Sequence, residues 1–337
     1  MVNESTIADG RVGTALDRLR AQRLVQLAQA NAQPGTIASR VYSRVLYGPD
    51  HPFALTPTET TIKSVTRDEV VAFHSEYFKP GRAIITVVGD VNAATVKSTL
   101  DKALAGWTAG GKKPAFKYPA PPTARATAIY LVDKPGSAQS VVSIGLPGPF
   151  RNTPDYMALE VMTFILGGHF QSRLNANIRE EKGYSYGVGS GFSFGKGPGP
   201  FTAGGDVVSD KTDAALVEFI KELRGIHGGG TITDDEMKTA KDALIQGLPD
   251  RFSTLSGIGS SILDLSLNDL PMDYYQNYPK AISAITKDDV LRVAKKYVDL
   301  DHLNIVIVGD RKSIEGPLKA TGIAPIVILD AEGVPQK

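Results

Sequence analysis

The run Gly183-Tyr184-Ser185-Tyr186-Gly187 is a pattern in this 337-residue sequence whose residue types could do chemistry. In serine hydrolases a Gly-x-Ser-x-Gly run places the serine on a sharp turn between a strand and a helix, where its hydroxyl acts as a nucleophile. Here a helical pattern precedes the run and a strand pattern follows it, so that Ser185 would face opposite Tyr186. A serine esterase that uses Ser185 is therefore only a remote alternative.

Side chains that could bind a metal ion are few. The sequence has no cysteine, which excludes disulfides, thiolate nucleophiles and cysteine zinc sites. The histidines are His51, His74, His169, His227 and His302. None of them has a second histidine at the spacing that would put two ligands on one helical face. His169 follows a pair of glycines, which is more typical of a helix end than of a metal ligand.

Two glycine-rich runs, 187–191 and 195–199, could suggest a phosphate-binding loop. They lack the downstream Lys-Ser/Thr pair and a helix start, so turns or a hairpin between strands explain them better. Tyr274, Tyr275 and Tyr278 lie at helical spacing, and the sequence leaves open whether they belong to the core or line a groove.

The composition excludes several classes of protein. Thirty-seven basic and 36 acidic residues leave a formal net charge of +1, which gives no electrostatic reason to expect nucleic acid or an anionic membrane as a partner. Hydrophobic residues make up 42% and charged residues 22%, as in ordinary globular proteins. No apolar run reaches the length of about 18 residues that a membrane helix needs, and the first 30 residues contain no apolar core of a secretory signal.

An internal repeat organises the elements that must position these side chains. Residues 62–90 align without a gap to residues 282–310 at an offset of 220. In each copy a threonine, Thr66 or Thr286, lies three residues before an acidic residue. This spacing predicts that the threonine is the N-cap of an amphipathic helix. A β-branched strand that ends in Gly-Asp follows in each copy. The simplest interpretation is two copies of one α/β domain.

The pattern of the second copy predicts a complete domain. Strands are expected near 127–133, 139–147, 184–194, 200–208 and 305–308, and helices near 154–167, 170–181, 211–226, 233–247, 251–269, 273–283 and 287–298. Because strands and helices do not strictly alternate, the fold class is α+β, with helices covering a mixed sheet.

The first copy lacks the corresponding beginning. The residues before it are helical in pattern, at 16–33 and 35–48, and contain no strand signals. We therefore expect an incomplete first domain at 1–108, a proline-rich linker at 109–126, a complete domain at 127–320 and a tail at 321–337. Exposed sheet edges and apolar helix faces are unfavourable in water, so we expect another polypeptide to complete residues 1–108, or those residues to be poorly ordered.

Residues 166–187, LGGHFQSRLNANIREEKGYSYG, resemble the signature of the C-terminal half-domain of the insulinase/pitrilysin zinc peptidases, the inverzincins. The ends of the two repeats resemble that family as well. The resemblance spans nearly the whole chain and implies tandem duplicated pitrilysin-like domains that enclose a chamber in which peptides are cut.

The zinc site of that family is not found in this sequence. Its motif is H-x-x-E-H, and the nearest approach is His74-Ser75-Glu76, which lacks the second histidine. The family's distal glutamate ligand corresponds to Gln26 in DRLRAQRLVQ, and a neutral amide binds zinc far more weakly than a carboxylate does. We therefore expect no metal in this chain, and zinc on a partner chain.

Arg179 and Tyr186 match an arginine and a tyrosine, seven residues apart, that the family places opposite the zinc. By resemblance they contact the substrate backbone and stabilise the oxyanion, a role that suits a permanently charged guanidinium and a directional phenol donor. The alternative is a surface pair between Arg179 and its acidic neighbours, with Tyr186 a half-buried strand residue.

The resemblance thus implies a non-catalytic Arg/Tyr-type subunit or fragment of a zinc peptidase. Its partners would be a peptide substrate and either a zinc-bearing pitrilysin-like subunit or a second copy of the chain. A purely structural or peptide-binding homologue is the competing possibility. The family suggests a periplasmic or secreted location, with the cytoplasm left open.

Overall fold

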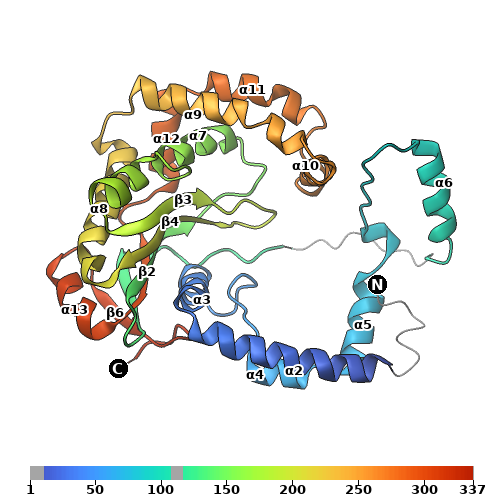
Figure 1. Ribbon diagram of the computed structural model, residues 1–337, viewed down its shortest axis with the longest axis horizontal. Helices are drawn as coiled ribbons and strands as arrows, with labels where there is room; N and C mark the ends of the chain where they lie inside the picture. The colour runs from blue at the N-terminus through green and yellow to red at the C-terminus, as the bar shows by residue number, and fades with distance from the viewer. Residues whose placement is uncertain (1–10, 108–116, 337) are drawn as a thin grey trace. The chain divides into compact units, whose positions relative to one another are not determined.

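The computed structural model describes residues 11–107 and 117–336, and in them the chain divides into two compact units. The first unit comprises Met1–Ala30, Thr56–Lys117 and Asp250–Asp264, and the second comprises Asn31–Leu55, Tyr118–Pro249 and Leu265–Lys337. The six strands that the described residues form all belong to the second unit (Figure 1). Among the helices of 11–107 and 117–336, none combines the length and the apolar composition that a membrane span requires.

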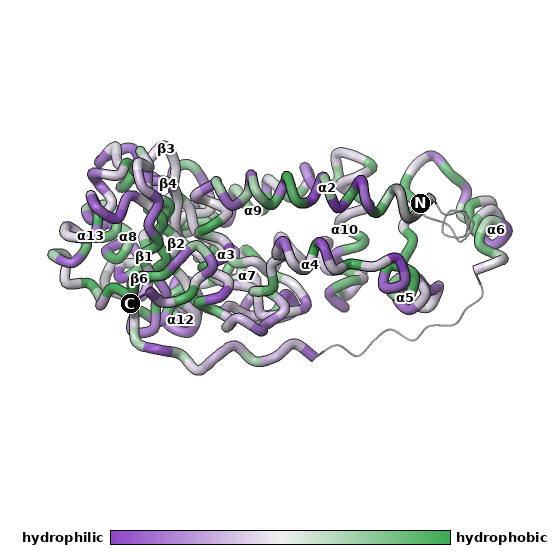
Figure 2. Tube along the Cα trace, turned by 90° about the horizontal axis from the view of Figure 1, so that it is seen from below, coloured by the Kyte–Doolittle hydropathy of each residue, from purple (hydrophilic) through white to green (hydrophobic). Residues whose placement is uncertain are grey.

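The second unit is built on one mixed sheet with the strand order β3-β4-β2-β5-β1-β6. Its strands are β1 (Ala128–Asp133), β2 (Gln139–Pro147), β3 (Ser185–Phe192), β4 (Pro200–Val208), β5 (Asn304–Gly309) and β6 (Ile326–Leu329). Strand β1 pairs in parallel with β5 and β6, whereas β2 pairs antiparallel with β4 and β5, and β3 with β4. The predicted α+β class is confirmed. Figure 2 colours β1 and β2 as hydrophobic segments, as expected for strands covered on both faces.

Successive residues of β5 point to opposite faces of this sheet. Ile305 and Ile307 belong to the large core under the helical layer, and Val306 and Val308 belong to a smaller core on the other face. All four side chains are fully buried. Burying a side chain of this size stabilises a fold by about 1.5–3 kcal/mol, so both layers are needed to keep the sheet out of water.

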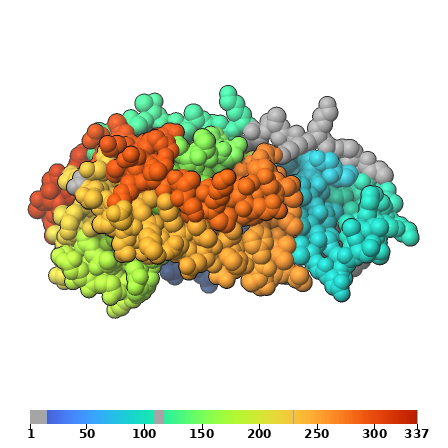
Figure 3. All heavy atoms as spheres, turned by 90° about the horizontal axis from the view of Figure 1, so that it is seen from above, coloured from blue at the N-terminus to red at the C-terminus, as the bar shows by residue number. Residues whose placement is uncertain are grey.

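Helices cover the face of the large core (Figure 1). They are α7 (Tyr156–Leu166), α8 (Thr212–Arg224), α9 (Asp234–Gln246), α11 (Tyr274–Ala284), α12 (Lys287–Tyr297) and α13 (Arg311–Ala320). In the space-filling view of Figure 3, the orange side chains of α9 and α11 form part of the outer surface of this layer. Each helix contributes buried apolar residues to one stripe and leaves its other side to solvent.

The opposite face is covered by α3 (Pro34–Tyr47), which the sequence had assigned to the first domain. Its buried residue Val41 packs in the smaller core. The hydroxyl of Tyr42 donates a 2.7 Å hydrogen bond to the carbonyl oxygen of Phe201 on β4. A Cβ atom at Gly145 would lie 2.1 Å from that hydroxyl, so only glycine fits at this point of β2. Residues 31–55, which the sequence analysis placed in the first domain, thus lie in the second unit.

The C-terminal residues 321–337 were expected to be a tail, but β6 adds them to the sheet. Ile129 and Val132 of β1 lie opposite Ile326 and Leu329 in a parallel pairing. Leu329 is buried in the smaller core. The strand β6 is short, with four residues. Helix α13 precedes it and supplies the crossover connection that its parallel pairing with β1 requires.

The helical halves of the two repeats have the same local structure. Helix α5 (Arg67–Tyr77) begins with a capping box in which Thr66 and Glu69 bond reciprocally, and α12 begins with the same device at Thr286 and Asp289. The strand halves differ. Residues 304–309 form β5, whereas 84–88 pair with no other strand within the described residues. The two segments thus share a capped helix but not the strand after it, and the duplication stays a prediction.

The first unit consists of helices and connecting segments in the described residues. They are α2 (Arg11–Ala32), which continues into the second unit, α4 (Glu59–Ser64), α5, α6 (Ala93–Ala103) and most of α10 (Leu255–Leu267). The guanidinium of Arg20 donates a 2.7 Å hydrogen bond to the carbonyl oxygen of Val65, which ties α2 to the turn between α4 and α5. No apolar side chain of this unit is buried among those whose exposure is described.

The predicted linker can be followed only in part. Residues 109–116 lie outside the described residues, and 117–126 form neither helix nor strand, as its proline content indicates.

Candidate functional site

The two residues singled out by the sequence lie on consecutive elements that are joined by one tight turn. Arg179 belongs to η2 (Asn175–Glu181), a π-helical segment, and Tyr186 belongs to β3. Gly183 makes the turn between them with a φ of 66°, a conformation that glycine adopts without strain. The amide of Tyr184 then donates to the carbonyl oxygen of Ile178 at 2.9 Å, so the strand starts directly beside the helix. Most of the helix predicted at 170–181 is present, and turns occupy 170–172 in place of its first residues.

Arg179 has two neighbours that orient its guanidinium. One nitrogen, Nη1, lies 3.2 Å from a carboxylate oxygen of Glu180, and the side chain is 29% exposed. The carbon Cζ lies 3.9 Å from the centre of the Phe170 ring. Cation–π contacts of this kind contribute about 0.5–2 kcal/mol, depending on how much water is excluded. The surface pair with Glu180 that the sequence offered as an alternative is thus present, together with the aromatic contact.

Tyr186 is 88% exposed, so the alternative in which it is a half-buried strand residue is wrong. Its position is a β-bulge, because Ser185 and Gly187 pair with consecutive residues of β4 and leave Tyr186 between them without a partner. A bulge turns one side chain out of the regular alternation and frequently occurs beside functional sites. The phenol is therefore exposed to solvent, while the residues before and after it remain paired with β4.

Ser185 builds this bulge and has no role as a nucleophile. The residue is 7% exposed, and its hydroxyl oxygen accepts a 3.0 Å hydrogen bond from the amide of Gly187. Two carbonyl oxygens are within reach of its single O–H donor, that of Asp206 at 2.5 Å and that of Gly187 at 3.0 Å. A nucleophilic serine needs a base and an exposed turn between a strand and a helix, neither of which is found here. The structure contradicts the esterase alternative.

The loop before η2 is anchored to the strands and to α7. The α7 helix ends at Leu166, and the carbonyl oxygen of Gly167 accepts a 3.2 Å hydrogen bond from the amide of Ser190. A Cβ atom at Gly167 would lie 2.3 Å from that amide nitrogen, so the close approach requires glycine. His169 donates through Nδ1 to the carbonyl oxygen of Phe164 at 2.8 Å. His169 is therefore a helix-end residue, as its sequence context indicated.

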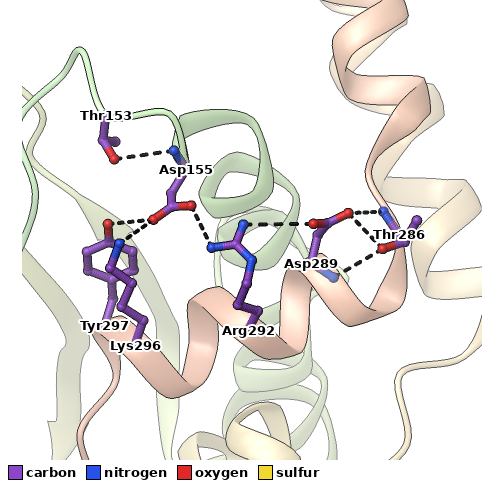
Figure 4. Close-up of polar contacts among 7 residues, drawn as sticks. All are labelled: Thr153, Asp155, Thr286, Asp289, Arg292, Lys296 and Tyr297. Atoms are coloured by element: carbon purple, nitrogen blue, oxygen red, sulfur yellow. Dashed lines mark hydrogen bonds and ion pairs between the residues drawn. The ribbon is translucent and has the colours of Figure 1, made fainter.

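The buried carboxylate of Asp155 connects α7 to α12 (Figure 4). Asp155 is 6% exposed and accepts hydrogen bonds from Arg292 at 2.6 Å, Lys296 at 2.7 Å and Tyr297 at 2.8 Å. Burial opposes ionisation, but these three donors outweigh it and lower the pKa of Asp155 to about 2. This cluster fixes the repeat helix α12 against the core and is structural.

Two of the three tyrosines on α11 contribute to the large core, whereas Tyr275 is half-buried outside it. Tyr278 is 7% exposed and is part of the large core. Tyr274 accepts a 3.2 Å hydrogen bond from Arg151, whose guanidinium lies 3.7 Å from the ring centre of Tyr156. Burial raises the pKa of Tyr274, which keeps its phenol neutral.

The described residues do not fit a zinc ion. Within 11–107 and 117–336, no three His, Cys, Asp or Glu side chains lie close enough together to hold a metal. Gln26 lies on an exposed face of α2 in the first unit, and its amide oxygen accepts a 3.3 Å hydrogen bond from Arg23. Buried His51 uses both ring nitrogens, one toward the amide of Phe53 and one toward the carbonyl of Pro119.

Phe170 was not singled out from the sequence, although it lies inside the signature at 166–187. Its ring is 60% exposed and stacks on the guanidinium of Arg179 nine residues later. The turns at 170–172 separate Phe170 from the helix of Arg179, so no helical periodicity relates the two positions. The available signal was an aromatic residue two positions after a glycine pair.

Comparison with known proteins places these features in a family. The sequence model described as the peptidase M16 inactive domain matches residues 64–244. An uncharacterized zinc protease of Streptomyces coelicolor is 26% identical over 325 residues, which cover 90% of this chain and 65% of that protein. A protein of Helicobacter pylori named non-peptidase homolog YmxG is 23% identical over 306 residues, covering 88% of this chain and 68% of that protein.

A solved structure shares the fold. The crystal structure of a peptidase M16 inactive domain from Pseudomonas fluorescens superposes with a TM-score of 0.79 and 25% sequence identity. The match covers 88% of this chain and 70% of that one. The chain thus spans about two thirds of the length of the proteins it matches, 65% in the Streptomyces relative.

Proposed function

Because the chain belongs to the family of the peptidase M16 inactive domain, we propose that it is the non-catalytic, Arg/Tyr-bearing part of a zinc peptidase. In this proposal Arg179 and Tyr186 contact the backbone of a peptide substrate and stabilise the negative charge that develops on the carbonyl oxygen. The resemblance at 166–187 pointed to the same family, which the comparisons confirm.

The observation that carries the proposal is the presentation of Tyr186. A large aromatic side chain that is 88% exposed gains little from its own fold. Its backbone is nevertheless fixed by the bulge and by the Ser185 hydroxyl. A solvent-facing donor on such a backbone, seven residues after a permanent cation, supports binding of an oxyanion or a peptide carbonyl.

The chemistry assigned to the two residues requires hydrogen-bond donors. An arginine guanidinium carries five N–H donors in one plane, and a tyrosine phenol carries one O–H donor. Donors held in place before the reaction stabilise charge without reorganising, which is the largest contribution in many acyl-transfer enzymes. Any zinc would be supplied by a partner, because the described residues do not fit that ion.

The first unit supports a partner as well. None of its apolar side chains with a described exposure is buried, and Ile84, Ile85 and Val87 are about half exposed in a segment that has no strand partner among the described residues. A half-exposed, β-branched segment without a strand partner is stabilised when another strand pairs with it. We propose a zinc-bearing pitrilysin-like subunit or a second copy of the chain as that partner, in the periplasm or outside the cell.

A structural or peptide-binding homologue without any part in catalysis is the second candidate. The ion pair between Arg179 and Glu180 favours it, because a guanidinium held by its neighbour is less available to substrate. The two candidates differ in what happens when these side chains are removed.

The test is peptide cleavage by the assembled peptidase with Arg179→Ala or Tyr186→Phe. We expect kcat/KM to fall by about 100-fold for the first and about 10-fold for the second. Tyr184→Phe and Arg311→Ala are matched controls, since Tyr184 packs on the core and Arg311 pairs with Glu315 at the surface. Unchanged cleavage in both site variants, with normal assembly, would leave the structural role as the better account.

A further inference from the structure

Phe170 is an exposed aromatic residue on a backbone that the fold holds firmly. Its ring is 60% exposed, yet the residues on either side are anchored. The preceding His169 stacks on Phe164 with ring centres 4.0 Å apart and donates to its carbonyl oxygen. The carbonyl of His169 in turn accepts from the Asn175 side chain at 3.2 Å. The position of the Phe170 ring is thus set by the same residues that set η2.

Asn175 links this loop to the strand that carries Tyr186. Its Nδ2 donates to His169, and its Oδ1 accepts a 3.1 Å hydrogen bond from the amide of Val188 on β3. The residue is 7% exposed, so these bonds are protected from water. One buried amide side chain therefore fixes the loop of Phe170 relative to the strand of Tyr186.

Two groups contact the Arg179 guanidinium. The Phe170 ring lies against its face, with Cζ 3.9 Å from the ring centre, and Glu180 holds Nη1 at one edge. The contact with Glu180 is an ion pair, and no hydrogen bond from this guanidinium to the protein is found within the described residues. A ring against one face fixes the plane while the remaining nitrogens stay free to donate in that plane.

We propose that Phe170 is a positioning residue: its ring holds the Arg179 guanidinium in the orientation in which its free nitrogens meet the substrate. The effect of Phe170 on peptide cleavage rests on the proposed function. The claim that the Phe170 ring orients the Arg179 guanidinium does not depend on it. Without the ring, the carboxylate of Glu180 would compete with the substrate for the guanidinium, and no other contact would hold the guanidinium in place.

The first measurement is NMR of the full-length chain with ¹⁵N-labelled arginine. A guanidinium against an aromatic face has its Nε–Hε resonance displaced by the ring current, and the Arg179 resonance is assigned by its loss in Arg179→Gln. We expect Phe170→Ala and Phe170→Leu to remove this displacement and Phe170→Tyr to keep it. Glu180→Gln is the matched control and leaves the displacement in place. An Arg179 resonance that is the same in wild type and Phe170→Ala would overturn the proposal.

The second measurement is a double-mutant cycle in the assembled peptidase. We expect Phe170→Ala to lower kcat/KM by about 3- to 30-fold, the range that a cation–π contact corresponds to. Phe170→Tyr restores cleavage to within about twofold, because the ring face is retained. In the Arg179→Ala background Phe170→Ala has no further effect.

The outcomes separate the two claims. An equal loss from Phe170→Ala with and without Arg179 would mean that the ring acts on the substrate directly, and the positioning role would be wrong. If Arg179→Ala leaves cleavage unchanged, the proposed function fails, while the NMR result still decides whether Phe170 orients Arg179.

Discussion

The guanidinium of Arg292 donates a 2.6 Å hydrogen bond to the carboxylate of Asp155 and joins the start of α7 to the middle of α12. Asp155 is the buried member of this pair, whereas the Arg292 side chain is half exposed. Lys296 and Tyr297 bond the other carboxylate oxygen. One aspartate thus satisfies three donors of the repeat helix (Figure 4).

Asp155→Asn is expected to destabilise the second unit by about 2 kcal/mol at pH 7, which corresponds to the lowering of the Asp155 pKa from 3.8 to about 2. Urea unfolding followed by circular dichroism measures the change. Asp288→Asn is the control, because Asp288 is exposed in the first turn of the same helix and should change stability by less than about 0.5 kcal/mol. Equal unfolding midpoints for wild type and Asp155→Asn at pH 7 would refute the assignment.

The same carboxylate predicts a pH dependence. Because the folded pKa is below the unfolded value, the stabilisation is complete above the unfolded pKa near 3.8 and is lost as the pH falls through about 2. The difference in unfolding free energy between wild type and Asp155→Asn should therefore be constant from pH 7 to about pH 5 and shrink below about pH 4. A difference that grows on acidification would have the wrong sign.

Gly145→Ala tests the packing of α3 on the sheet. A Cβ atom there would lie 1.9 Å from the carbonyl oxygen of Phe201 and 2.1 Å from the Tyr42 hydroxyl, so β4 or α3 must move. We expect a loss of about 2–3 kcal/mol in unfolding free energy. Gly191→Ala on β3 is the matched control, since nothing lies within 4 Å of a Cβ atom at that position. If both variants unfold alike, α3 is not packed as described.

The helix caps of the two aligned segments could be predicted because each cap depends on residues that are close in sequence. Thr66 with Glu69 and Thr286 with Asp289 are three residues apart, and both pairs form the capping boxes that their spacing indicated. The sheet strands 128–133 and 304–309 were found for the same reason, since apolar β-branched runs carry their own signal.

Features that depend on distant residues could not be predicted. Asp155 and Arg292 are 137 positions apart, and neither has a neighbour in sequence that reveals the pair. The packing of α3 on β5 was missed because its amphipathic pattern does not say which sheet it covers. The exposure of Tyr186 results from a bulge, which depends on the register with β4. The roles of Arg179 and Tyr186 in catalysis remain predictions.

Zinc content is a separate prediction. The purified chain is expected to contain fewer than about 0.1 zinc ions per chain after dialysis, because Gln26 is a neutral amide and no ligand cluster is found in the described residues. Elemental analysis with protein quantification checks it. Close to one zinc per chain, removed by a chelator together with peptidase activity, would contradict this expectation.

Hydrogen exchange of the isolated chain tests the state of the first unit. Amides of 59–104 should exchange faster than those of 128–309, because the described part of the first unit buries no apolar side chain. Addition of the partner subunit should slow exchange at 84–88 if a strand pairs there. Equal protection of both regions in the isolated chain would show that the first unit is stable alone.

The central claim, that Arg179 acts on the developing oxyanion, is tested most directly with a phosphinic peptide, whose tetrahedral anion imitates the transition state. The measurement is the inhibition constant of this peptide for the assembled peptidase, with wild-type chain and with Arg179→Ala, beside KM for the matching substrate. The account predicts that the inhibition constant rises by about 100-fold while KM rises by no more than about threefold. Equal changes in the two constants, or no change in either, would contradict it.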